Sequence, residues 1–315
     1  MIKLKLFLVQ ASILFFALIL IEGMLRIVNS DMTNYDIEMW RYAKELKQAD
    51  SLFGHKHIKN KSSILQGVEI KLNSRGMRSD EFKNDEKKIL FLGSSISLGW
   101  GVELNDSYPQ IIQTKLLLDS INYKVLNGSV GNYNTFRYVN NFLDNNDDIN
   151  PNIIVINYFI NDVETLPIGS SNWFLQNSQL IASLTMAYKK LFAKSGLDLK
   201  SYYKNLYLED NPSFIEMNNS LVKLSKYSKK TNTPILLVVI PDIHFLENYP
   251  FELIHKKMKN ISLDLEFEYH DLLPSLKGIS FEKLQIIPGD SHPNAYGHKK
   301  MAETLYPILK EVILQ

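Results

Sequence analysis

The sequence predicts an α/β protein with a three-layer α/β/α domain, in which a central, mostly parallel five-stranded sheet lies between two layers of helices. A membrane-spanning helix is predicted ahead of this domain. From Lys88 onward, short apolar runs alternate with helical stretches of 10 to 20 residues. Such alternation favours parallel strands joined by right-handed crossovers, with helices on both faces of the sheet. Ahead of this region, the uncharged run from Leu6 to Ile21 has the composition of a membrane-spanning segment.

Residues 1–30 are predicted to form the membrane anchor. Lys3 and Lys5 precede the apolar run, whereas the charged residues on its far side sum to minus one. The positive-inside rule therefore keeps the N-terminus cytoplasmic and places the rest of the chain outside the cytoplasm. A cleaved signal peptide and a buried core helix are the alternatives. Because Arg26 separates the apolar run from the small residues at 28–30, we expect an uncleaved anchor.

Residues 31–87 are predicted to form a connector that packs on the α/β domain. They contain a helical pattern at 37–48 and a short strand followed by a turn at 74–76. His55 and His57 have a spacing that a metal site uses, but no further cluster of ligands lies nearby in the sequence. We therefore expect both histidines in a solvated loop, and we predict neither a metal nor another cofactor.

The α/β domain is predicted to cover residues 88–315. An insertion at 166–211, between the third and fourth strands, belongs to no strand and helix unit. Its amphipathic part, 173–192, is expected to form either a lid or substrate wall, or an element that packs at the periphery. The strands are expected at 88–93, 123–130, 152–160, 234–242 and 266–272, and the helices at 107–120, 135–143, 214–230 and 294–313.

Polar residues follow the predicted strands at the carboxyl edge of the sheet, where sheets of this kind bind ligands. Two serines at 94–95 follow the first strand, a glycine-rich stretch at 127–132 follows the second, and Asn-Asp at 161–162 follows the third. The sequence PGDSHPN at 288–294 adds an Asp and a His two residues apart. Together they supply the parts of a serine-dependent acyl-transfer site. Taken singly, each is more typical of a helix cap, a turn or a surface residue.

These motifs resemble those of the SGNH (GDSL-like) hydrolase family, and the resemblance covers most of residues 70–312. ILFLGSSISLGWGV is similar to the first block of the family, NGSVGNYNT to the second, YFINDVE to the third and DSHPNAYGHKKMAE to the last. KLNSRGMR and YPFELIH resemble segments of membrane-anchored bacterial members. The resemblance implies a flavodoxin-like fold and a hydrolase that acts on ester bonds. Ser94 stands where the family usually has an aspartate.

The resemblance also implies roles for individual residues. Ser95 would be the nucleophile, His292 the general base, and Asp290 the residue that orients His292. The backbone amides of Ser95 and Gly131 and the side-chain amide of Asn161 would bind the oxyanion, and losing one such donor typically costs about 3 to 4 kcal/mol of transition-state stabilisation. His292 would take the Ser95 proton during attack on the ester carbonyl and later protonate the leaving alcohol.

Other residues carry less specific signals. Trp100 is expected either to line the acyl pocket or to pack beneath the helix that follows Ser95. No Gly-Lys-Ser/Thr or G-x-G-x-x-G sequence follows the first strand, so a phosphate-binding loop is not expected. The remaining histidines, which are expected to be packing or surface residues, are His244, His255, His270 and His298.

The function expected from the sequence is a membrane-anchored serine esterase that hydrolyses an acyl or acetyl ester of a lipid or cell-envelope glycan through an acyl-enzyme on Ser95. One alternative is an O-acyltransferase that moves an acetyl group to a glycan hydroxyl. Another is a catalytically degenerate domain that binds glycan. Nucleic acid is not an expected partner, because the net charge is +1 and no run of basic residues interleaved with aromatics occurs.

Overall fold

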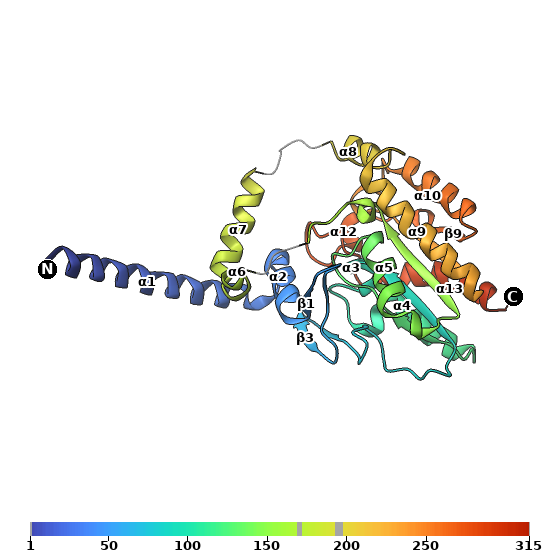
Figure 1. Cartoon of the computed structure of the whole chain (residues 1–315), viewed down its shortest axis with the longest axis horizontal. Coiled ribbons are helices and arrows are strands. Elements are labelled where there is room, and N and C mark those ends of the chain that lie inside the picture. The colour runs from blue at the N-terminus through green and yellow to red at the C-terminus, as the bar shows by residue number, and fades with distance from the viewer. Residues whose placement is uncertain (1, 169–171, 193–197, 315) are drawn as a thin grey trace.

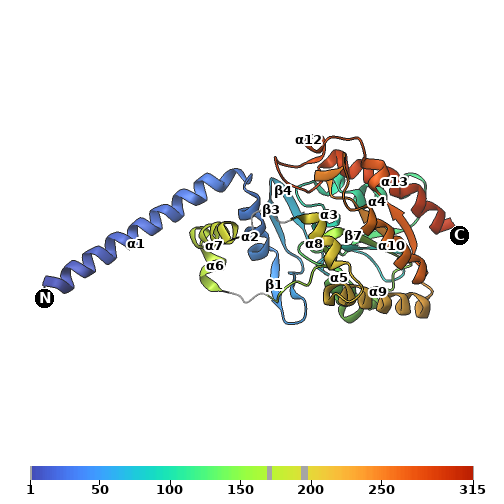
Figure 2. The same cartoon turned by 90° about the horizontal axis from the view of Figure 1, so that it is seen from above.

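The computed structural model describes residues 2–168, 172–192 and 198–314, and it shows a long N-terminal helix that projects from an α/β domain (Figures 1 and 2). This helix, α1 (Ile2–Val28), is long and apolar enough to cross a membrane, and none of its residues is buried in the protein. At about 1.5 Å per residue, its length exceeds the roughly 30 Å of a bilayer's hydrocarbon core.

The central sheet contains all five predicted strands, and every neighbouring pair is parallel. The strand order β6-β5-β7-β8-β9 is that of a flavodoxin-like doubly wound sheet, in which the order reverses between β5 and β7. The strands are β5 (Lys88–Gly93), β6 (Lys124–Asn127), β7 (Ile153–Phe159), β8 (Ile235–Ile240) and β9 (Glu268–Asp271).

Helices cover both faces of this sheet, as predicted. α4 (Tyr108–Leu118) packs against α13 (Ala295–Leu314), and α5 (Thr135–Asn145) packs against α9 (Pro212–Thr231). α10 (Glu252–Asp264) joins β8 to β9 and packs on both, and no helix was predicted there. A helix is needed at this point because two parallel strands cannot be joined by a tight turn.

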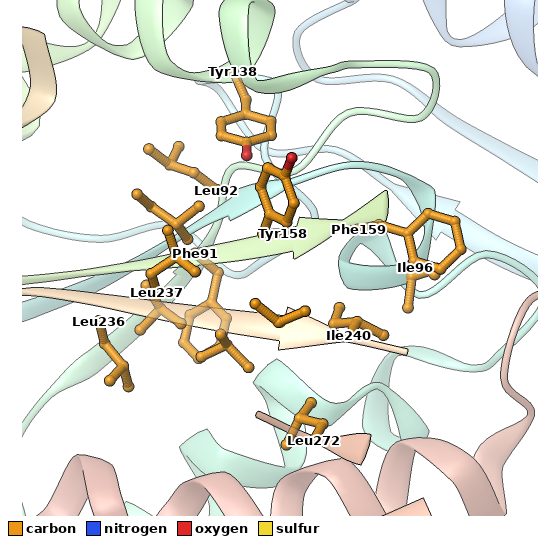
Figure 3. Packing of buried hydrophobic residues seen from close by; sticks show 14 of the residues in the cluster. Phe91, Leu92, Ile96, Tyr138, Tyr158, Phe159, Leu236, Leu237, Ile240 and Leu272 are labelled. Atoms are coloured by element: carbon orange, nitrogen blue, oxygen red, sulfur yellow. The ribbon is translucent and has the colours of Figure 1, made fainter. Parts of the chain in front are cut away.

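The main core extends to the residues beside the predicted site. Figure 3 shows Phe91 on β5 and Tyr158 on β7 within the sheet, with Tyr138 reaching toward Tyr158 from α5. At the carboxyl edge, Ile96 and Phe159 belong to the same buried cluster. The segments that follow β5 and β7 are thus fixed by core packing next to the side chains that they present.

Residues 31–87 form a helix and two antiparallel hairpins. The helix is α2 (Tyr35–Glu45), and the hairpins pair β1 (Lys47–Asp50) with β2 (Gly54–His57), and β3 (Ser62–Leu65) with β4 (Val68–Lys71). A second buried cluster joins these elements to the segment after Ser95; it comprises Tyr42, Leu46, Leu65, Ile70, Leu72, Leu98 and Trp100. The connector therefore shares a core with the α/β domain.

The insertion forms α6 (Trp173–Asn177), α7 (Gln179–Phe192) and α8 (Leu199–Leu206). α7 packs against both α1 and α2, and the Trp40 indole N–H donates to the Leu175 carbonyl across 2.6 Å. The remaining short elements are α3 (Ser95–Leu98), α11 (Leu273–Leu276), α12 (Phe281–Leu284), and the 3₁₀ turns η1 (Asn29–Asp31), η2 (Leu104–Asp106), η3 (Asp147–Ile149), η4 (Ile160–Val163) and η5 (Ile243–Phe245).

Candidate active site

Ser95 is the first residue of α3 and follows directly after the turn that ends β5. Gly93 must be small there, because a Cβ atom at this position would lie 2.9 Å from the Asn157 Cβ on the neighbouring strand. The Ser94 carbonyl accepts the Leu98 N–H across 3.0 Å, but the Ser94 hydroxyl bonds to no described residue. The turn thus presents Ser95 at the sheet edge, and backbone bonds hold it there.

His292 joins Ser95 to Asp290. His292 Nε2 lies 2.7 Å from Ser95 Oγ, and its Nδ1 lies 2.6 Å from Asp290 Oδ1. The same carboxylate oxygen also accepts the backbone N–H of His292 across 3.0 Å. With the imidazole proton on Nδ1 and donated to Asp290, Nε2 is left to accept the Ser95 hydroxyl proton. Asp290 and His292 are both buried, whereas Ser95 is partly exposed and so accessible to a ligand.

Asn161 lies in η4, the turn after β7, and its side chain is exposed. This side chain makes no hydrogen bond to any residue that the structure describes, so its amide N–H groups are available. Asp162 is fully buried, and its carboxylate accepts the Phe159 N–H across 3.2 Å. Burial raises the pKa of the Asp162 carboxyl well above its usual range. Asp162 therefore serves to hold the turn, whereas Asn161 is the residue of the pair that can meet a ligand.

The backbone N–H of Gly131 is not free to bind the oxyanion, contrary to the expectation from the sequence. The Gly131 N–H donates to the Tyr42 hydroxyl across 2.9 Å, and a Cβ atom at Gly131 would lie 2.6 Å from the Tyr42 ring. This amide is therefore already bonded to the connector. The next residue, Asn132, has a left-handed φ of 63° and is exposed, and its backbone N–H bonds to no described residue. Asparagine tolerates this conformation better than most residues other than glycine.

The connector also holds the Gly131 carbonyl. Lys47 Nζ donates to it across 2.7 Å, and His55 Nε2 donates across 3.0 Å. His57 bonds to the Tyr42 hydroxyl across 2.7 Å and to the Gly76 carbonyl across 2.8 Å. Burial lowers the pKa of both imidazoles to about 3. The expectation of a solvated loop for these histidines was wrong, because their side chains are directed inward and bind backbone groups.

Arg78, the last residue of the KLNSRGMR segment, is a second support from the connector. It is buried, and its guanidinium donates to the carbonyls of Leu98, Gly99, Val102 and Glu69 across 2.5 to 3.2 Å. Three of these carbonyls belong to the segment that follows Ser95. Burial lowers the pKa of Arg78 to about 10, so the guanidinium remains charged at neutral pH. It supplies donors to carbonyls that the short helix α3 cannot satisfy itself.

Two aromatic rings lie beside His292. The Tyr35 ring, at the start of α2, has its centroid 5.8 Å from that of His292, and the Trp100 centroid lies at 6.5 Å. Burial, with the nearby Asp290 charge, raises the pKa of the Tyr35 hydroxyl. Trp100 is fully buried and belongs to the core shared with the connector. Of the two expectations for Trp100, packing beneath the helix after Ser95 is therefore the one that the structure favours.

Other histidines make internal contacts. His255 bonds to Asp271 across 2.9 Å and to the Tyr249 hydroxyl across 2.7 Å, which resembles the His292 pair in geometry but involves no serine. His298 is fully buried and stacks on Tyr108, and burial lowers its pKa to about 3. Within the described ranges, no group of three or more His, Cys, Asp or Glu side chains is placed to hold a metal ion.

No protein-family model and no curated protein sequence matches this chain. Among solved structures, TesA matches with a TM-score of 0.48 and 14% identity, over 71% of this chain and 99% of TesA. Axe2, an acetylxylan esterase from Geobacillus stearothermophilus, matches with a TM-score of 0.48 and 18% identity, over 70% and 93% of the two chains. EstA, a psychrotrophic esterase from Pseudoalteromonas sp., matches with a TM-score of 0.45 and 16% identity, over 73% and 100%.

A cavity of about 400 Å³ lies beside Asn132. Its walls come from the connector, from the turn that contains Asn132, and from the end of α6. Polar side chains that line it are Lys44, Lys47, Gln48, His55, Asn132, Gln176 and Asn177, of which Lys47 and His55 already bind the Gly131 carbonyl. Amide and ammonium groups of this kind hydrogen-bond readily to hydroxyl-rich ligands, whereas an acyl chain would leave them unpaired.

Proposed function

We propose that the protein is a serine esterase of the SGNH (GDSL-like) hydrolase family. The hydrogen-bonded series from Ser95 Oγ through His292 to Asp290 carries this proposal, with distances of 2.7 and 2.6 Å. A general base within hydrogen-bond reach of a hydroxyl, itself oriented by a buried carboxylate, is the arrangement that activates a serine nucleophile. Ser94 lacks such a base, so Ser95 is the serine that reacts.

Catalysis would proceed in two steps. Ser95 Oγ attacks the ester carbonyl while His292 Nε2 takes the hydroxyl proton, and this proton passes to the alcohol oxygen as the carbon–oxygen bond breaks. Water then attacks the acyl-enzyme, giving its proton to His292 as the new bond forms. The acid leaves as the Ser95 oxygen takes that proton back. Asp290 stabilises the imidazolium that forms in each step.

The oxyanion would be bound by donors from three segments. These are the backbone N–H of Ser95, the side-chain amide of Asn161 and the backbone N–H of Asn132, which replaces Gly131 in this role. None of the three groups bonds to a described residue, so each is free to donate to a substrate. Donors fixed in advance at the point where negative charge develops lower the barrier without reorganising during the reaction.

The site would work close to a membrane surface. We propose that α1 crosses the membrane with the N-terminus in the cytoplasm, since Lys3 and Lys5 precede its apolar run. Tyr35, whose ring lies beside His292, is only 7 residues beyond Val28, where α1 ends. Seven extended residues span at most about 25 Å. The substrate is therefore expected within the layer of lipid head groups and glycans next to the membrane.

The polar cavity beside Asn132 favours an acetylated glycan over an ester with a long acyl chain. The same cavity also favours a second candidate function, in which a sugar hydroxyl replaces water as the acceptor and the protein is an O-acyltransferase. Both functions share the acyl-enzyme on Ser95. They differ only in the molecule that attacks it.

The test uses the full chain in phospholipid nanodiscs with p-nitrophenyl acetate and p-nitrophenyl octanoate, each with and without an unacetylated oligosaccharide. We expect acetate release in water without the oligosaccharide, and slower turnover of octanoate. Ser94→Ala, the matched control, is expected to keep the activity that Ser95→Ala loses. Turnover only with the oligosaccharide present would contradict the esterase function and support the acyltransferase function. Absence of turnover with either ester, with or without acceptor, would overturn both.

A further inference from the structure

The insertion carries an exposed apolar face that the esterase chemistry does not use. On α7, Leu184, Ala187, Tyr188 and Leu191 are exposed and recur at the three- and four-residue spacing of one helix face. Leu184 has an exposed fraction of 61% and Leu191 one of 80%. The adjacent α6 adds Trp173 and Phe174, exposed by 68% and 63%. We refer to these six residues as the α6–α7 apolar face.

Polar contacts attach α7 to the C-terminal end of α1. The Glu22 carboxylate on α1 accepts the backbone N–H groups of Gln179 and Leu180 across 3.0 and 2.9 Å, and the Ser178 hydroxyl across 2.9 Å. Arg26 pairs with Glu22 and also donates to the Asn177 carbonyl. Glu22 thereby caps the first turn of α7. This explains why an otherwise apolar helix carries two charges near its end.

The direction of α7 fits a membrane surface. Figure 1 shows α7 running across the direction of α1, and Figure 2, turned by 90°, looks nearly along α7 while α1 is seen from the side. In both views α7 lies on the side of α2 that faces the N-terminal end of α1. If α1 crosses the bilayer, α7 lies parallel to the membrane plane at the level of Glu22 and Arg26.

We propose that the α6–α7 apolar face is a membrane-binding surface that inserts between the head groups and acyl chains of the bilayer that α1 crosses. An amphipathic helix in the membrane plane binds in this way, and tryptophan is favoured at that depth. Continuity with α1, which has an exposed apolar surface of its own, favours lipid over a second copy of the chain. The proposal rests on α1 as the anchor, but it is independent of the esterase chemistry.

The consequence would be a second attachment to the membrane. A single helix joined to a domain leaves the domain free to rotate about the helix axis. Because α7 also packs on α2, insertion of the α6–α7 apolar face would fix the orientation of the connector relative to the bilayer. Tyr35 lies at the start of α2 beside His292, so the candidate site would be held at one orientation to the membrane surface.

The absence of cysteine from the sequence makes a depth measurement direct. Single nitroxide labels would be attached to Leu184→Cys and Leu191→Cys in the full chain, placed one molecule per nanodisc of phosphatidylcholine and phosphatidylglycerol. Collisions with oxygen, which enriches in the bilayer, would be compared with collisions with a water-soluble nickel chelate. The controls are Leu118→Cys and Leu263→Cys, whose leucines are 78% and 63% exposed on α4 and α10.

We expect the ratio of oxygen to nickel collisions to be several-fold higher at 184 and 191 than at 118 and 263. Leu14→Cys, within α1, reports the anchor separately and is expected to give a still higher ratio. A ratio at 184 and 191 equal to that of the controls, with a high ratio at 14, would overturn the proposal and leave the anchor intact. Low collision with both reagents at 184 and 191 would mean that protein covers this face, which also contradicts it.

Discussion

Ser95, Asn161 and His292 lie on segments that follow strands of the sheet or precede its last helix, whereas several groups that fix those segments come from residues 31–87. Asp290 and His292 form their hydrogen bonds within one short loop. By contrast, Arg78 reaches over to the segment after Ser95. Residues 31–87 therefore form part of the framework of the site. Substitutions in them should alter the positions of the site residues and leave the reacting groups unchanged.

The largest effect is expected from Asp290→Asn. The asparagine amide would donate to His292 Nδ1 and so favour the tautomer that cannot accept the Ser95 proton, which lowers kcat by about 10⁴ in a comparable site. The measurement is kcat for p-nitrophenyl acetate. Asp271→Asn, which alters the pair of Asp271 and His255 at 2.9 Å, is the matched control and should leave kcat nearly unchanged. Equal losses in the two variants would contradict the assignment of His292 as the base.

Arg78→Met is expected to have the next largest effect, on stability. It removes a buried cation and the guanidinium donors of four carbonyls, of which only the Gly99 carbonyl also accepts a backbone N–H, from Val102, among the bonds outside the helices and strands, so the free energy of unfolding should fall by about 3 to 5 kcal/mol. Urea unfolding measures this. Arg75→Met is the control from the same segment, because Arg75 pairs with Asp148 at the surface and such pairs contribute about 1 kcal/mol or less. Similar losses in both variants would show that Arg78 does not support the segment after Ser95.

The buried histidines of the connector should make the free energy of unfolding depend on pH. His57 has a pKa of about 3 in the folded protein against about 6.5 when unfolded, so the unfolded chain binds the extra proton between these values. The contribution of the neutral imidazole to the free energy of unfolding is therefore complete above pH 6.5. It is lost as the pH drops toward 3, by about 1.4 kcal/mol per pH unit for each such histidine. Urea unfolding of His57→Gln from pH 6 to pH 4 should show a shallower loss. An unchanged slope would contradict the buried neutral imidazole.

The smallest effect is expected from Tyr42→Phe. The ring and its packing stay, but the Gly131 N–H and His57 lose their hydroxyl partner, which should lower the free energy of unfolding by about 1 to 2 kcal/mol. We expect kcat to fall by less than about tenfold, through displacement of the turn that carries Asn132. A rise in kcat would instead mean that the freed Gly131 amide acts on the substrate, against our placement of the oxyanion donors.

The sequence was sufficient to predict the parts of the molecule that depend on local patterns. The fully buried strands β5, β7 and β8 lie in predicted ranges because buried parallel strands are continuous apolar runs, as β7 shows. The loop from Asp290 to His292 could be predicted for a similar reason, since its two partners are neighbours in the chain.

The supports from the connector could not be predicted in this way. Lys47 and Arg78 bind backbone carbonyls, which every residue possesses, so no pairing of residue types reveals their partners. His55 and His57 form a pattern that is also common in solvated loops. The occupied Gly131 amide follows from Tyr42, which lies 89 residues away in the sequence. The HxH spacing and the KLNSRGMR motif were the available signals, but neither indicates which backbone group is bound.

The most direct test of the central claim is reaction of the full chain with a fluorophosphonate probe, followed by peptide mapping by mass spectrometry. We expect one adduct, on Ser95, in the wild-type protein and in Ser94→Ala, and none in Ser95→Ala or His292→Ala. An adduct on Ser94, or no adduct on wild-type protein whose circular dichroism shows it to be folded, would contradict it.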